Sequence, residues 1–141
     1  MKGLFITFEG IEGSGKSTQA KLLKERLERQ SIPVLLTREP GGSRIAETIR
    51  QILLSEDNQD ILPVTELLLY EAARAQHVDE IIRPALEKGV VVISDRFADS
   101  TTAYQGAGRS IDLETIELLH KIATRGIWPD VTVILDLPVN E

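Results

Sequence analysis

The sequence predicts an α/β fold of three layers, with a parallel β-sheet between two layers of α-helices. Short apolar segments alternate with amphipathic segments of helical period along the chain, which is typical of parallel strands joined by crossover helices. Val90–Ile93 is almost wholly β-branched and apolar, as expected of a central strand buried on both faces. Functional groups are therefore expected outside the carboxyl ends of the strands.

The expected elements alternate regularly. Four strands are predicted at Leu4–Phe8, Val34–Thr37, Val90–Ile93 and Val131–Leu135. Helices are predicted at Thr18–Gln30, Ser43–Leu54, Pro63 to about Ala75, His77–Lys88, and from a cap at Asp112 to about Arg125. Pro84 should kink or restart its helix, and residues 98–110 are expected to form a polar loop or short helix.

Three helices carry apolar stripes that are expected to face the core. The inward residues predicted from helical spacing are Ala20, Leu23 and Leu27; Ile45, Ile49 and Ile52 or Leu53; and Leu113, Ile116, Leu119 or His120, and Ile122. The two histidines, His77 and His120, have no partner at metal-ligand spacing, so both are interpreted as structural.

Composition restricts the kinds of protein this chain can be. Its 141 residues, without linkers or repeats, suit a single domain. The net charge of −6 argues against a nucleic-acid polymer as partner, since phosphate backbones bind basic faces. No apolar run is long enough to span a membrane, and Met1–Gly3 shows no signal-peptide pattern, so a cytoplasmic location is expected. With no cysteine, disulfides and cysteine-ligated zinc are excluded.

The most specific motif is a phosphate-binding loop. Gly10–Ser17 fits G-x-x-x-x-G-K-[ST], and it lies between a predicted strand and a predicted helix. Backbone N–H groups and the helix N-terminus would cradle the phosphates of ATP. The predicted ATP-binding residues are Gly10, Ile11, Glu12, Gly13, Ser14, Gly15, Lys16, Ser17 and Thr18. This motif assigns the chain to the P-loop NTPase class of α/β folds.

Other strand ends add charged residues. Arg38 follows the second strand, Asp95 and Arg96 follow the third, and Asp136 follows the fourth. Five segments, in this order, together resemble the thymidylate kinase family of nucleoside monophosphate kinases. They are Phe8–Gly10 with its loop, Arg38–Gly42, Tyr70–Arg74, Asp95–Phe97 and Ala103–Gly106.

The resemblance implies transfer of the γ-phosphoryl group of ATP to dTMP, with Mg²⁺ as cofactor. It implies that Tyr70 stacks on thymine, that Arg74 and Gln105 hydrogen-bond the base, and that Tyr104 packs under the sugar. Pro40 would form part of the floor of the base pocket.

The phosphate side of the site is predicted in the same way. Lys16, Arg96 and Glu12 are the predicted catalytic residues, and Arg96 and Arg38 would grip the acceptor phosphate. Ser17 and Asp95 are the predicted Mg²⁺ ligands, partly through water. A carboxylate in a phosphate-binding loop is unfavourable unless it points away or pairs with a cation, and the resemblance implies that Glu12 contacts Arg96. In the family an acidic residue here faces the acceptor's 3′-hydroxyl.

Alternatives remain open at this point. The chain could phosphorylate another nucleotide or a deoxynucleoside, or could be a nucleotide-binding module with impaired catalysis. A switch-type GTPase is a weaker alternative, because no N-K-x-D segment is present.

The resemblance also implies a homodimer. It places a lid arginine, a fifth strand and an adenine-contacting segment beyond Glu141, so the domain is expected to be incomplete at its C-terminal side.

Overall fold

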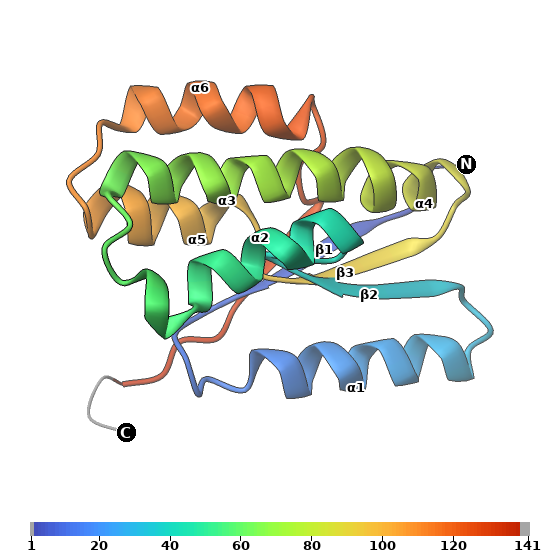
Figure 1. Ribbon diagram of the computed structural model, residues 1–141. Coiled ribbons are helices and arrows are strands. Elements are labelled where there is room, and N and C mark those ends of the chain that lie inside the picture. The colour runs from blue at the N-terminus through green and yellow to red at the C-terminus, as the bar shows by residue number, and fades with distance from the viewer. Residues whose placement is uncertain (1, 139–141) are drawn as a thin grey trace.

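The computed structural model describes residues 2–138 and contains a four-stranded parallel sheet in the order β2-β3-β1-β4 (Figure 1). The central strands are β1 (Phe5–Glu9) and β3 (Val91–Asp95). They are flanked by β2 (Val34–Arg38) and β4 (Val131–Ile134). The predicted parallel α/β fold and the central position of the third strand are therefore confirmed.

The helices cover both faces of the sheet (Figure 1). On one face lies α1 (Lys16–Arg29), and on the other lies α3 (Pro63–His77), which packs against α2 (Arg44–Leu54) and α6 (Leu113–Thr124). The shorter helical segments are η1 (Glu56–Asn58), η2 (Val78–Ile82), α4 (Arg83–Glu87), α5 (Ala98–Thr101) and η3 (Thr102–Ala107).

The strands alternate their side chains between two apolar clusters, as the two-residue period of a strand requires. Phe5 and Val92 point to the α4 side of the sheet, where they pack with Ile82 and Leu86. Ile6 and Ile93 point to the other side, where they pack with α1 through Ala20, Leu23 and Leu27. The predicted inward stripe of the first helix is confirmed.

The inward faces of two other helices differ from the prediction. In α2 the prediction holds for Ile49 and for Leu53, the alternative to Ile52, but it is wrong for Ile45, which is exposed like Ile52. The inward face carries Ala46 in place of Ile45. Apolar residues lie on either side of this face, so their spacing alone did not fix the rotation, and packing against α3 decides it.

In α6, the prediction holds for Ile116 and His120 but is wrong for Leu113 and Ile122. Both of these side chains are exposed, and the stripe that faces α3 continues through Ala123. The helix has apolar residues on two faces, and within residues 2–138 the face with Leu118 and Ile122 is exposed.

Pro84 interrupts the long helical segment as predicted. Between α3 and α4 the chain makes a π-turn at η2, in which the Arg83 N–H donates to the Val78 carbonyl. A proline cannot donate its own N–H to the preceding turn, and the wider turn absorbs this defect. Within residues 2–138, no helix is both long and apolar enough to cross a membrane.

Candidate active site

The phosphate-binding loop joins β1 to α1. Gly13 and Gly15 have φ angles of 77° and 92°, which a residue with a Cβ adopts only under strain. These two glycines let the chain turn sharply into the N-terminus of α1, which favours an anion. The buried Lys16 ammonium folds over the loop and donates to the Ile11 carbonyl at 3.1 Å.

The first turn of α1 meets the end of β3 through a hydroxyl and a carboxylate. Ser17 Oγ donates to Asp95 Oδ2 at 2.6 Å, while the buried Asp95 Oδ1 has no hydrogen-bond partner. A hydroxyl and a carboxylate oxygen are ligands that Mg²⁺ prefers. The free carboxylate oxygen is satisfied if an ion, or its water, lies beside it. These two residues therefore fit the metal predicted from the sequence.

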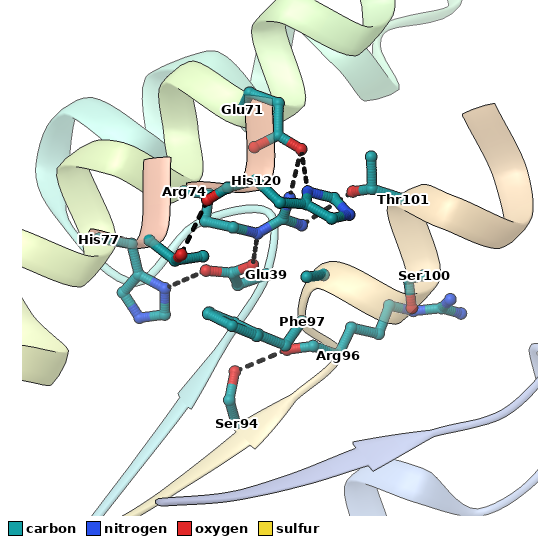
Figure 2. Close-up of polar contacts among 12 residues, drawn as sticks. Glu39, Glu71, Arg74, His77, Ser94, Arg96, Phe97, Ser100, Thr101 and His120 are labelled. Atoms are coloured by element: carbon teal, nitrogen blue, oxygen red, sulfur yellow. Dashed lines mark hydrogen bonds and ion pairs between the residues drawn. The ribbon is translucent and has the colours of Figure 1, made fainter. Parts of the chain in front are cut away.

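Arg96 is held in an unfavourable backbone conformation, with φ at 73°. Three hydrogen bonds fix it there: the Arg96 N–H donates to the Phe8 carbonyl, Ser94 Oγ donates to the Arg96 carbonyl, and the Phe97 N–H donates to Glu9 Oε2 (Figure 2 shows the Ser94 contact). Because β1 and β3 are neighbours, the ends of these two central strands determine where the Arg96 side chain points.

The Arg96 side chain reaches back toward the phosphate-binding loop. Its Nη2 donates to Glu12 Oε1 at 2.7 Å, which confirms the contact predicted between these residues. The guanidinium also lies 5.4 Å from the centroid of the Tyr104 ring. The Arg96 pKa is raised: burial would lower it, but Tyr104 and Glu12 outweigh burial. Arg96 thus keeps its positive charge between the loop and the adjacent cavity.

A cavity of about 260 Å³ opens beside this contact. It lies between the α2–α3 pair and the α5–η3 segment. Of the eight residues predicted to contact the acceptor, it is lined by seven: Glu12, Pro40, Tyr70, Arg74, Arg96, Tyr104 and Gln105. Residues up to 93 positions apart in the sequence, from Glu12 to Gln105, are therefore brought together at one site.

Arg38 is the predicted acceptor residue that does not line this cavity. Its guanidinium donates to both carboxylate oxygens of Glu47, at 3.2 and 2.8 Å. It lines a neighbouring cavity of about 380 Å³, together with Ser17 and Asp95. Arg38 thus shares a cavity with the candidate metal ligands and not with the other predicted acceptor residues. Asp136 is exposed and lines neither of these two cavities.

Arg74 lines the cavity and is buried. Figure 2 shows its polar contacts. Its Nε donates to Glu39 Oε1, Nη1 donates to Glu71 Oε1, and Nη2 donates to Thr101 Oγ1, each at 2.8 Å. The Phe97 ring lies beneath it, with its centroid 5.4 Å from the guanidinium carbon. A buried cation needs such partners, because an unpaired charge is costly away from water.

The two histidines complete this network. His77 Nδ1 pairs with Glu39 Oε2, and His120 Nδ1 pairs with Glu71 Oε1, each at 2.7 Å (Figure 2). Both rings are buried. His77 joins α3 to the loop that follows β2, and His120 joins α6 to α3. Their interpretation as structural residues agrees with these contacts.

Comparison with known proteins identifies the family of this chain. The thymidylate kinase family model matches residues 8–141. A thymidylate kinase of Nitratidesulfovibrio vulgaris is 56% identical over 138 residues, and one of Geotalea daltonii is 57% identical over 138 residues. Each alignment covers 98% of this chain. The chain belongs to the thymidylate kinase family.

A solved structure of a family member agrees with the fold. The thymidylate kinase of Ehrlichia chaffeensis superposes with a TM-score of 0.91 at 43% identity, over 98% of this chain and 78% of that one. The chain spans 64% of the length of each of the two thymidylate kinases compared above.

Several cavity residues were missed by the sequence analysis of this thymidylate kinase family member. Arg50 lines the cavity and donates to the Pro40 carbonyl at 2.8 Å. In the sequence it cannot be distinguished from the other polar residues of an amphipathic helix. Glu39 and Thr101 also line it, next to Arg74. Glu9 does not line it, yet it anchors the segment that carries Arg96, and its place at the end of a strand was the available signal.

Glu39 gives stability a predictable pH dependence. Burial would raise the pKa of Glu39, but Arg74 and His77 outweigh it and hold this pKa below the ordinary 4.5. A carboxyl group with a lowered folded pKa stabilises the fold above the unfolded pKa, and this stabilisation is lost as the pH falls. We expect the midpoint temperature of unfolding to decrease as the pH is lowered past about 4.5. In Glu39→Gln this decrease should be less steep.

The measurement is thermal unfolding from about pH 7 to about pH 3. Glu117→Gln, which changes an exposed glutamate of α6, serves as the control and should keep the wild-type slope. An equal slope in wild type and Glu39→Gln would contradict the lowered pKa.

Proposed function

We propose that this chain binds ATP at the phosphate-binding loop and dTMP in the adjacent cavity. Its activity would be transfer of the γ-phosphoryl group of ATP to dTMP, giving dTDP and ADP. The observation that carries the proposal is the cavity that gathers seven of the predicted acceptor residues, Arg96 among them, beside the phosphate-binding loop. The names of the relatives support the same activity.

Positioning and charge neutralisation dominate phosphoryl transfer. Lys16 would lie against the outer phosphates of ATP, and Arg96 would hold the acceptor phosphate from the cavity side. Tyr70, Arg74 and Gln105 would bind the base. The Gln105 amide nitrogen donates to Glu66 at 3.0 Å. Together these groups would align donor and acceptor.

Ser17 and Asp95 would hold Mg²⁺, which neutralises phosphate charge when bound. We predict that Asp95→Asn removes most of the Mg²⁺ dependence of ATP binding, because it deletes the carboxylate charge at the site. Calorimetric titration of ATP with and without Mg²⁺ measures this. Asp99→Asn, in α5, is the control and should keep the Mg²⁺ effect. An unchanged Mg²⁺ effect in Asp95→Asn would exclude this ligand role.

The activity is tested by ADP release with ATP, Mg²⁺ and dTMP, together with calorimetry of dTMP binding. Release that stops when dTMP is omitted supports the kinase, and comparison with dUMP, dCMP, dGMP and AMP defines the acceptor. A nucleotide-binding module with little turnover is the alternative that the same experiment tests. Binding of dTMP without turnover would favour it, and no binding would reject the thymidylate assignment.

We further propose a cytoplasmic homodimer with small-molecule ligands and no nucleic-acid or membrane partner. The support is the exposed apolar face of α6, where Leu118 and Ile122 are 59% and 62% exposed and one helical turn apart. A second copy of the chain is the partner implied by the family.

Leu118→Asp is predicted to shift the chain from dimer to monomer, since a charge cannot be buried unpaired in an apolar interface. Sedimentation velocity at several concentrations measures the change. The control is Leu22→Asp, which places the same charge at an exposed position of α1 and should leave the dimer intact. A wild-type monomer at every concentration would reject the dimer.

A further inference from the structure

Arg74 has more donors than the fold uses. A guanidinium carries five N–H groups in one plane. Glu39, Glu71 and Thr101 accept one contact each, from three different nitrogens. Within residues 2–138 the other two N–H groups have no hydrogen-bond partner, and Arg74 lines the cavity, so we infer that a ligand there can accept from them. These three contacts and the Phe97 ring beneath hold the guanidinium in one orientation.

Each carboxylate that holds Arg74 is itself held by a histidine. Glu39 lies between Arg74 and His77, whose other ring nitrogen pairs with Thr37 Oγ1 of β2 at 2.7 Å. Glu71 lies between Arg74 and His120. The carboxylates therefore cannot follow Arg74 if it moves, because each is tied to a second element of the fold.

The opposite side of the network is tied in the same way. His120 Nε2 pairs with Thr102 Oγ1 at 3.1 Å, next to Thr101, which accepts directly from Arg74. The chain of contacts thus runs from β2 through α3 to α6 and back to the α5–η3 segment (Figure 2 shows its centre). All the carboxylates, the guanidinium and both imidazoles in it are buried.

We propose that Glu39 and Glu71 are positioning residues for Arg74, and that they set the preference of the cavity for a base that presents a carbonyl oxygen. The inference rests on the proposed function, in which Arg74 contacts the base. Two N–H donors in a fixed direction attract a carbonyl acceptor, and they repel an amino group at the same place, because donor then meets donor.

The test measures binding of dTMP, dCMP and ATP by calorimetry, so that it does not depend on turnover. Glu39→Gln keeps the shape of the side chain but removes its charge. We expect it to weaken dTMP binding by about tenfold and to reduce the preference for dTMP over dCMP, while ATP binding changes less than about twofold. Asp79→Asn removes a carboxylate that pairs with Arg83 and Arg125 away from the cavity, and it should leave all three affinities unchanged.

A double-mutant cycle separates positioning from a general structural role. Arg74→Lys keeps the charge but lacks the planar fork. If Glu39 acts through Arg74, Glu39→Gln added to Arg74→Lys causes no further loss of dTMP affinity or of base preference. Additive losses in the cycle would overturn the inference, and so would an unchanged dTMP-to-dCMP ratio in Glu39→Gln.

Folding is checked on every variant by thermal unfolding. If Glu39→Gln does not fold, Thr101→Val replaces it in the cycle, because it removes a contact to Arg74 without leaving a buried charge unpaired. Failure of wild type to bind dTMP would overturn the proposed function and this inference with it. Binding of dTMP by wild type with additive losses would overturn this inference alone.

Discussion

Arg96→Ala is expected to weaken dTMP binding by roughly 30- to 1,000-fold, which corresponds to about 2–4 kcal/mol. The side chain is the cation that joins the phosphate-binding loop to the acceptor cavity, through its 2.7 Å contact with Glu12. Its removal deletes the proposed contact to the acceptor phosphate and leaves the Glu12 carboxylate without its partner. Calorimetric titration of dTMP measures the loss.

Arg125→Ala is the matched control, because Arg125 is an exposed arginine that pairs with Asp79 outside the cavity. It should bind dTMP as wild type does. Arg96→Lys should recover only part of the affinity, since a single ammonium cannot bind phosphate with two parallel donors. Wild-type dTMP affinity in Arg96→Ala would refute the placement of the acceptor phosphate.

Phe97→Ala is expected to lower the free energy of unfolding by about 3–5 kcal/mol. Phe97 is buried, and its ring meets Phe5 edge-on with centroids 5.0 Å apart. The same ring lies beneath the Arg74 guanidinium. The substitution therefore opens a cavity in the core and removes the support of a buried cation. Urea denaturation should show a lower midpoint with an unchanged slope.

Leu22→Ala on α1 is the control for this stability prediction. Leu22 is 50% exposed, so its truncation should change stability by less than about 0.5 kcal/mol. A Phe97→Ala variant as stable as Leu22→Ala would mean that the ring does not contribute to the core as described.

Much of the fold could be predicted because its signals are local. Strand and helix periods, the phosphate-binding loop and the proline at residue 84 each act within a few residues, and the structure agrees with them. The inward faces of α2 and α6 were predicted only in part, because each helix has apolar residues on more than one face. Packing against the neighbouring elements, above all α3, selects Ala46 rather than Ile45, and it leaves Leu113 and Ile122 exposed.

The site divides in the same way. The sequence by itself determined the phosphate-binding loop and the residues at the strand ends, which a parallel sheet places at one edge. Most of the acceptor cavity followed from the resemblance of its motifs to the thymidylate kinase family. Tertiary structure alone decided that Arg38 pairs with Glu47, that Arg50 reaches the cavity, and that Glu39 and Glu71 hold Arg74. The partner of a buried charge is the opposite charge that the fold places beside it, and the separation of two residues along the sequence does not indicate which one that is.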